Sequence, residues 1–257
     1  MCGLSGMLGS PEPSIVRKMI QLQNHRGPDG SGMWQDDSVC LGHARLAIVD
    51  LEGSPQPIQS QEGNVLIANG EIYNFESLRS SMVDYSWRTF GDSETILALY
   101  EKSIRTDQKA SAKDHGDWIK QLDGMFAFAL WDAHNNQLIL ARDEMGIKPL
   151  VRSLVGSSLV FSSEVKGLCA HPGFEAQLDE QALMARLVWE YPLDATTLFL
   201  DVHQVRPGCV EVWSLEEGQP ILTDSYRFSE PKMIPSVEYE ETLGAQSLLD
   251  GFIDSVG

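Results

Sequence analysis

The residue in the most unusual position for chemistry is Cys2, directly after Met1. Methionine aminopeptidase removes Met1 where the second residue is small, and Cys2 would then carry both a thiol and a free α-amine. The reference pKa of an α-amine, about 7.7–8.0, lies near the thiol value of about 8.5, so the amine can act as general base without a histidine. Position alone is weak support, since an unpaired cysteine is commonly a small buried apolar residue.

Short motifs elsewhere in the chain strengthen this interpretation of Cys2. In chain order they are Cys2–Gly6, His25–Gly30, His43–Asp50, Asn69–Asn74, Gly91–Glu94, Leu122–Asp132, Arg142–Leu150, Ser162–Lys166 and Arg206–Gly208. Together they closely resemble the N-terminal glutaminase domain of glutamine-hydrolysing asparagine synthetases, a class II (N-terminal nucleophile) amidotransferase. Several motifs in order are more specific than any one of them, and the resemblance covers about the first 228 residues.

The resemblance assigns three catalytic residues. It implies that Cys2 attacks the side-chain amide of glutamine and forms a glutamyl thioester. It also implies that the side-chain amide of Asn69 and the backbone N–H of Gly70 form the oxyanion hole. Each donor of this kind stabilises the transition state by a few kcal/mol. The same Asn-Gly pair is a strong hairpin signal, which predicts a type I′ turn within Val65–Tyr73. Both interpretations can hold, because a turn presents a backbone N–H rigidly.

The resemblance also implies a pocket for glutamine. Arg45 would hold the α-carboxylate, a task suited to a planar bidentate donor, and the backbone of Ile48 and Val49 would line the pocket. Asp92 would pair with the α-ammonium, assisted by Glu71. Without this context Arg45 is a surface residue before a strand, and Asp92 is an N-cap for the helix that follows. Recognition of the zwitterion would explain selectivity for free glutamine over glutamine in a peptide.

The pattern along the chain predicts mostly strands as the elements that position these residues. We expect strands at Gly3–Leu8, Leu46–Val49, Met125–Trp131, Gln137–Arg142 and Ser158–Ser162, and a hairpin over Val65–Tyr73. We expect helices at Ser14–Gln23, Glu94–Glu101 and Asp179–Val188, and a polar surface insertion at Ser103–Asp117. This mixture indicates an α+β protein with largely antiparallel sheets. The resemblance implies the four-layer αββα sandwich of N-terminal-nucleophile hydrolases.

The predicted organisation has three parts: a class II glutamine amidotransferase domain over 1–228, a linker over 229–239, and an amphipathic helix over 240–257. One face of the helix would carry Leu248, Leu249, Phe252, Ile253 and Val256. The helix resembles the start of a synthetase domain, whose Ser-Gly-Gly-x-Asp-Ser pyrophosphate loop does not occur in these 257 residues. We therefore expect either a separate synthetase chain or a homo-oligomer as partner, or a chain cut at the domain junction.

Composition excludes several classes of partner. The 257 residues hold 37 acidic and 19 basic side chains, a net charge of −18, which argues against nucleic acid or an anionic membrane as partner. The four cysteines form no CxxC pair, so neither a zinc site nor a disulfide framework is supported, and no metal or cofactor is expected. We interpret the cysteines other than Cys2 as buried thiols. The N-terminus lacks the features of a signal peptide, so the cytoplasm is the expected compartment.

The expected reaction is hydrolysis of L-glutamine to L-glutamate and ammonia. Two alternatives stay open. The amidophosphoribosyltransferase and glucosamine-phosphate synthase types of the same superfamily would carry different residues around His43–Asp50. The other alternative is a catalytically silent subunit that binds glutamine or regulates a synthetase complex, and the intact set of site residues argues against it.

Overall fold

Two six-stranded sheets form the centre of the computed structural model, which describes residues 1–48, 50, 53–104, 109–191, 194–230 and 241–256. The first sheet has the order β10-β8-β9-β1-β3-β2, with β1 (Gly3–Leu8), β2 (Gly30–Gln35), β3 (Val39–Arg45), β8 (Val151–Val155), β9 (Ser158–Ser162) and β10 (His203–Gln204). The second has the order β12-β11-β7-β6-β5-β4, with β4 (Ile58–Gln59), β5 (Val65–Ile72), β6 (Gly124–Asp132), β7 (Gln137–Arg142), β11 (Cys209–Glu216) and β12 (Gln219–Arg227). Every pairing between these strands is antiparallel.

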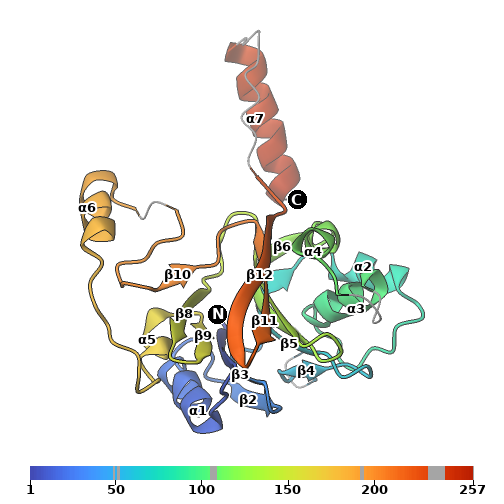
Figure 1. The fold of residues 1–257 in the computed structure, drawn as a ribbon. Helices are drawn as coiled ribbons and strands as arrows, with labels where there is room; N and C mark the ends of the chain where they lie inside the picture. Colours follow the sequence, from blue (N-terminus) through green and yellow to red (C-terminus); the bar gives the residue numbers. More distant parts are fainter. Residues whose placement is uncertain (49, 51–52, 105–108, 192–193, 231–240, 257) are drawn as a thin grey trace.

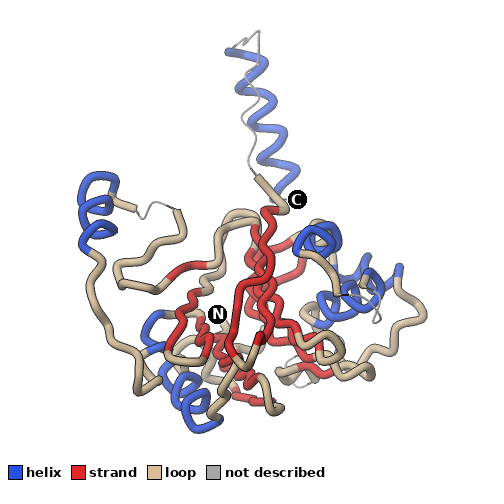
Figure 2. Tube along the Cα trace, viewed as in Figure 1, coloured by secondary structure: helices blue, strands red, loops and turns tan. Residues whose placement is uncertain are grey.

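Helices cover the outer face of each sheet. On the first sheet lie α1 (Pro13–Leu22) and α5 (Val165–Leu168); on the second lie α2 (Phe75–Ser81), α3 (Glu94–Ser103) and α4 (Ala112–Ile119). Figure 2 shows these helices outside the strands. The remaining helices are α6 (Glu180–Trp189) and α7 (Glu241–Val256), which extends away from the sheets (Figure 1). No helix of the described residues combines the length and apolar character needed to cross a bilayer.

Three apolar clusters hold the four layers together. Alternation along each strand sends one set of side chains between the sheets, among them Leu4, Ile67 and Ala129, and the other set towards the helices. Leu97 and Trp118 belong to the cluster beneath α3 and α4. The four-layer αββα sandwich, the α+β class and the largely antiparallel sheets are therefore confirmed.

Most elements lie where the sequence predicts them. The strands expected at Gly3–Leu8, Met125–Trp131, Gln137–Arg142 and Ser158–Ser162 are β1, β6, β7 and β9. The three predicted helices are α1, α3 and α6, and Asp179 caps α6 by accepting a hydrogen bond from the Ala182 N–H at 3.0 Å. Residues 241–256 form a helix as expected, whereas residues 231–240 of the predicted linker lie outside the described residues.

The hairpin predicted at Asn69-Gly70 is wrong. β5 runs through both residues without a turn and pairs continuously with β6, Asn69 opposite Ala127 and Gly70 opposite Phe126. Glycine is needed here for close approach: a Cβ on Gly70 would lie 2.4 Å from the carbonyl oxygen of Met125. The dipeptide signal fails because crowding by β6, and not a positive φ, selects the glycine.

Three further expectations also need correction. The strand predicted at Leu46–Val49 is wrong, because β3 ends at Arg45 and residues 46–48 follow as a loop; Val49 is not among the described residues. Ser103–Asp117 is not simply an insertion. Its described end enters α4, where a capping box of Ser111 and Asp114 starts a helix with buried packing residues. Cys40 and Cys209 are buried as expected, but Cys169 is exposed.

Candidate active site

The Cys2 thiol sits at the head of β1 against the loop that follows β3. Its Sγ lies 3.4 Å from the backbone N–H of Leu46, which donates to it, and 3.6 Å from the Leu46 carbonyl, which can accept from it. Burial raises the pKa of the Cys2 thiol, an effect that the Leu46 hydrogen bond and the nearby Arg45 only partly offset. The thiol is therefore protonated at neutral pH and needs a base before it can attack.

A charged cluster fixes the backbone of Cys2. Arg26 donates from Nε to the Cys2 carbonyl at 2.9 Å and from Nη1 to Glu164 Oε1 at 2.9 Å. His25 and Lys166 lie 3.0 and 3.1 Å from the same carboxylate. Partial burial alone would raise the pKa of Glu164, but the hydrogen bonds from Arg26, His25 and Lys166 lower it to about 2. His25 thus has a structural hydrogen-bonding role in this cluster.

The outer edge of β5 is completed by side chains where β4 stops. β4 pairs with β5 at Val65 and Leu66 only. Beyond it, the N–H of Ala68 donates to Gln56 Oε1 at 2.6 Å, and the N–H of Ile72 donates to Asp92 Oδ2 at 2.8 Å. Between these two hydrogen bonds, the outer edge of β5 is formed by Gly70.

The backbone N–H of Gly70 faces this edge. Groups of alternate residues point to the same side of a strand, so Gly70 shares the side of Ala68 and Ile72. On the opposite side Phe126 faces Gly70 but bonds its own N–H and C=O to Asp143, at 3.2 and 2.8 Å. Gly70 also lines the pocket that contains Cys2. Its N–H is thus directed at the space where a ligand would sit.

The Asn69 side chain lies on the inner face of β5, the face that packs against the first sheet. Val65 and Ile67, which share its face by alternation, lie in the core between the sheets. The Asn69 side chain is 1% exposed, and its Nδ2 has no hydrogen-bond partner among the described residues. An unpaired buried amide donor is costly, and a ligand oxygen would satisfy it.

The pocket that contains Cys2 also carries opposite charges. Arg45, Glu71 and Asp92 line it together with Cys2 and Gly70. Burial raises the pKa of Asp92, against hydrogen bonds from Ile72 and Ser93, and burial together with the negative Asp92 raises the pKa of Glu71. Arg45 donates from Nη2 to the Asp50 carbonyl at 2.6 Å. One guanidinium and two carboxylates can hold a zwitterion.

Of the predicted pocket residues, Ile48 also lines the pocket, at its exposed rim, and Val49 lies outside the described residues. Asn69 is not among the lining residues, although its neighbours Ala68 and Gly70 are.

Comparison with known proteins identifies the family of this chain. The profile of the family described as "Glutamine amidotransferase domain" matches residues 1–226. The chain belongs to this family. Relatives of this amidotransferase domain include asparagine synthetase (glutamine-hydrolysing) 3 of Bacillus subtilis, 34% identical over 81% of the chain and 34% of the relative. The asparagine synthetase of Asparagus officinalis is 39% identical over 66% of the chain and 29% of the relative.

The amidotransferase domain spans about a third of the length of these curated relatives. Asparagine synthetase 2 of Bacillus subtilis matches 98% of the chain at 29% identity, yet only 34% of its own length is covered. Among solved structures, glutamine phosphoribosylpyrophosphate amidotransferase from B. subtilis superposes with a TM-score of 0.65 at 20% identity, over 90% of this chain and 50% of that one. This likeness confirms the fold.

Sequence reasoning missed contributors to the amidotransferase site. Arg26 lies within a recognised motif, and its place there is the only signal that could have found it. Leu46 acts through backbone atoms, which leave no trace in side-chain type. Gln56, which lines the pocket, lies outside every motif that carries the resemblance.

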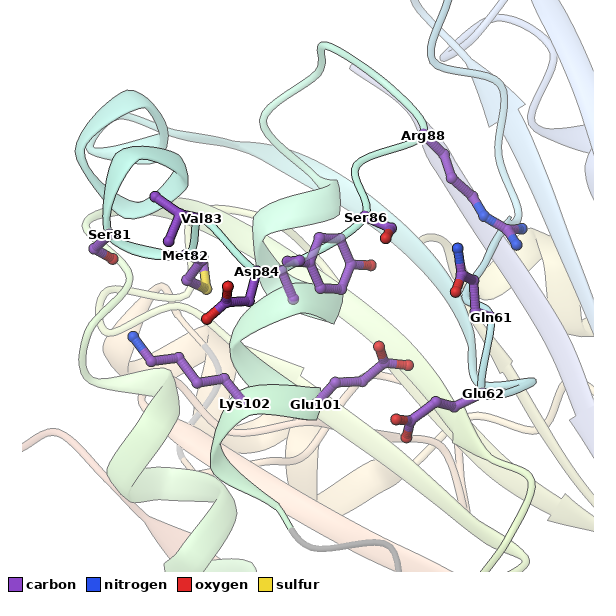
Figure 3. Close-up of a pocket in the computed structure, with 12 residues that line it drawn as sticks. Gln61, Glu62, Ser81, Met82, Val83, Asp84, Ser86, Arg88, Glu101 and Lys102 are labelled. Carbon is purple, nitrogen blue, oxygen red and sulfur yellow. The ribbon is translucent and has the colours of Figure 1, made fainter.

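A second, larger pocket is lined by a different set of residues (Figure 3). Its volume is about 380 Å³, and it is lined by residues of α2, α3, the segment between them and the loop between β4 and β5, including Glu62, Tyr85 and Glu101. It holds none of the predicted site residues. The pocket beside Cys2 is smaller, about 50 Å³, and we assign the site there because the nucleophile and the recognition charges meet in it.

Proposed function

We propose that the domain hydrolyses L-glutamine to L-glutamate and ammonia through a Cys2 thioester. The observation that carries the proposal is the shared pocket: Cys2 lies with Arg45, Asp92 and the Gly70 N–H around one space. A nucleophile, a receptor for a zwitterion and an oxyanion donor are the parts that acyl transfer from a free amino acid requires.

Binding would orient the substrate through its charged end. The α-carboxylate pairs with Arg45, and the α-ammonium pairs with Asp92 and Glu71. The side-chain amide then extends towards Cys2. Fixing the amide near the nucleophile replaces an encounter in solution by a reaction within one complex, which lowers the barrier.

Attack requires Cys2 to be the N-terminal residue. Met1 is 54% exposed, which is compatible with its removal. The Cys2 Sγ forms a bond to the amide carbon as the thiol proton passes to the α-amine. The amide oxygen becomes an oxyanion, and Asn69 Nδ2 and the Gly70 N–H donate to it. Donors placed where charge develops are worth a few kcal/mol each.

Breakdown returns the proton. The carbon–nitrogen bond breaks, the protonated α-amine gives its proton to the leaving nitrogen, and ammonia departs from the glutamyl thioester. Water then attacks the thioester while the α-amine accepts a proton. Cleavage of the carbon–sulfur bond releases glutamate, and the α-ammonium returns its proton to the sulfur, which restores the thiol and the free amine.

We propose an asparagine-synthetase-type partner as the destination of the ammonia, either a separate chain or a further domain. The support is that the curated relatives are named glutamine-hydrolysing asparagine synthetases and extend well beyond the matched third. Glutamine labelled with ¹⁵N in its amide should pass the label to the product of such a partner. Label found only as free ammonia, with partner present, would argue against the transfer.

The proposal is tested on protein whose Met1 is verified absent by mass spectrometry. Wild-type protein should release glutamate from glutamine, Cys2→Ala should not, and Cys169→Ala, which alters an exposed cysteine, should match the wild type. If wild type and Cys2→Ala are equally inert, the enzymatic function is wrong. Calorimetric titration with glutamine would then identify a silent glutamine-binding subunit.

A further inference from the structure

We infer that Gln56 is a positioning residue that holds the oxyanion hole in place through the backbone of Ala68, an inference that rests on the proposed function. Ala68 directly precedes Asn69 and Gly70 in β5, so its placement fixes theirs. The resemblance assigns no role to Gln56, and its participation follows from its contacts alone.

The Gln56 side chain binds both backbone groups of Ala68. Its Oε1 accepts from the Ala68 N–H at 2.6 Å, and its Nε2 donates to the Ala68 carbonyl at 3.1 Å. This is the pair of hydrogen bonds that a neighbouring strand would make. β4 pairs with β5 only at Val65 and Leu66, so the amide of Gln56 replaces the missing strand for one residue.

The side-chain amide of Gln56 is already hydrogen-bonded within the protein. Besides the Ala68 carbonyl, its Nε2 lies 3.5 Å from Ser93 Oγ, next to Asp92. Its carbonyl oxygen is engaged by the short bond from Ala68. Both donor hydrogens of the Gln56 amide are thus engaged, so although Gln56 lines the pocket, a hydrogen bond donated to glutamine would break one of these contacts. Positioning is therefore the function that its geometry favours over substrate binding.

The same carbonyl is held from the other sheet. His43 on β3 lies with Nε2 3.0 Å from the Ala68 carbonyl, and because a carbonyl can only accept, Nε2 donates. Burial lowers the pKa of His43 to about 4, so the ring stays neutral at physiological pH. The Ala68 carbonyl thus accepts two hydrogen bonds, one from Gln56 at the strand edge and one from His43 on the first sheet.

The backbone of Gln56 is itself held close to β2. A Cβ placed on Gly32 would lie 2.0 Å from the Gln56 carbonyl oxygen, so this strand and the segment that carries Gln56 are in direct backbone contact. A side chain anchored in this way can transmit the position of β2 to β5. Hydrogen bonds from an anchored group position a donor better than bonds from a mobile one.

Loss of this support should affect the transition state more than the bound substrate. The charged end of glutamine is recognised by Arg45 and Asp92, which the Ala68 contacts do not include. The oxyanion forms only during attack, so misplaced Asn69 and Gly70 donors would lower kcat and leave KM nearly unchanged. A purely structural role would lower stability without this separation.

The experiment compares Gln56→Ala with Gln59→Ala, a matched change at an exposed glutamine three residues away. We expect Gln56→Ala to lower kcat about 10–100-fold, part of the 10²–10³ that removal of an oxyanion donor costs, with KM within about threefold of wild type. Gln59→Ala should keep both constants. An aldehyde analogue of glutamine, which forms a tetrahedral adduct with a thiol, should bind Gln56→Ala more weakly by a factor similar to the loss in kcat.

Coupling to Asn69 gives the second readout. If Gln56 acts through the oxyanion hole, Gln56→Ala should cost much less activity in an Asn69→Ala background than in the wild type. Additive losses, or a KM that rises as much as kcat falls, would overturn the inference. Gln56→Glu keeps the shape and the acceptor of Gln56 but not its donor to the Ala68 carbonyl, and it should also lose kcat.

The outcomes also separate this inference from the proposed function. Wild-type protein that releases no glutamate would contradict the proposed function. Active wild-type protein with Gln56→Ala as fast as Gln59→Ala would contradict only the role of Gln56. Unfolding of both Gln56 variants would show that the residue serves stability and not alignment.

Discussion

Burial acts in one direction on three acidic groups of the pocket. It raises the pKa of the Cys2 thiol, the Asp92 carboxyl and the Glu71 carboxyl. For Cys2 this keeps the thiol neutral until a base removes its proton, which is why the proposed mechanism uses the α-amine as that base. For Asp92 the same effect means that the ionised form is held at a cost to the fold, and a bound ammonium would offset that cost.

Asp92→Asn should therefore change stability and binding in opposite senses. The folded pKa of Asp92 is raised, so its ionisation destabilises the fold once pH exceeds its ordinary pKa. The amide oxygen of the substituted side chain would still accept from the Ile72 N–H without a buried charge. We expect a Tm at or above that of wild type at pH 7, a difference that shrinks as pH falls through the raised pKa, and a KM for glutamine higher by roughly 30-fold or more.

Thermal unfolding from pH 4 to 8 and steady-state kinetics check this pair of effects. Asp37→Asn, at an exposed position, is the control and should leave both nearly unchanged. A fall in Tm at pH 7 with an unchanged KM would show that Asp92 is a structural residue.

At the level of elements, β5 determines how the site is built. Its sequence suggests a turn, yet it forms one strand whose edge is met in succession by β4, Gln56 and Asp92. The motifs that carry the resemblance pointed to Arg45, Gly70 and Asp92, which line one pocket and suit the proposed chemistry directly. They could not predict Gln56, because its role depends on the extent of β4. β4 pairs with β5 only as far as Leu66, and the edge of Ala68 is therefore left for the Gln56 side chain.

Gly70→Ala should damage both the strand and the site. The added Cβ would meet the Met125 carbonyl oxygen at 2.4 Å, so β5 and β6 must separate. We expect a loss of roughly 1–3 kcal/mol in the free energy of unfolding, typical of overpacking, and a fall in kcat of about 10²-fold or more from the displaced N–H. Denaturant unfolding and glutamate release measure the two effects.

The control for this change is Gly30→Ala at the start of β2, where a Cβ would meet nothing within 4 Å. It should retain stability and activity. Equal behaviour of the two variants would mean that β5 tolerates a side chain at position 70, and close approach would not explain the glycine.

At the scale of the whole molecule, α7 contributes no residue to the apolar core of the sandwich. Leu248, Leu249, Phe252, Ile253 and Val256 of α7 are 51–79% exposed and belong to none of the three core clusters. The sequence predicted this helix from its apolar face but indicated no surface to cover it. The α+β class was predictable because several strands carry their own periodicity, and the four-layer sandwich was implied by the family that the ordered motifs resemble.

Deletion of the residues after Ser236 should leave the active site intact. We expect the truncated chain to keep its Tm within a few degrees and to retain labelling of Cys2 by diazo-oxo-norleucine, while binding to a synthetase-type partner or solubility suffers. Mass spectrometry of the labelled peptide and a pull-down with the partner measure the two properties. Loss of labelling after truncation would show that α7 supports the catalytic domain.

The side-chain completion of the β5 edge has a consequence for aggregation. An uncovered sheet edge offers a row of donors and acceptors on which another chain can grow. Here Gln56 and Asp92 satisfy backbone groups on either side of Gly70, so the unpaired stretch between them is one residue long. A single donor can bind the oxygen of a small molecule, but it is too short a template for a second strand to align on.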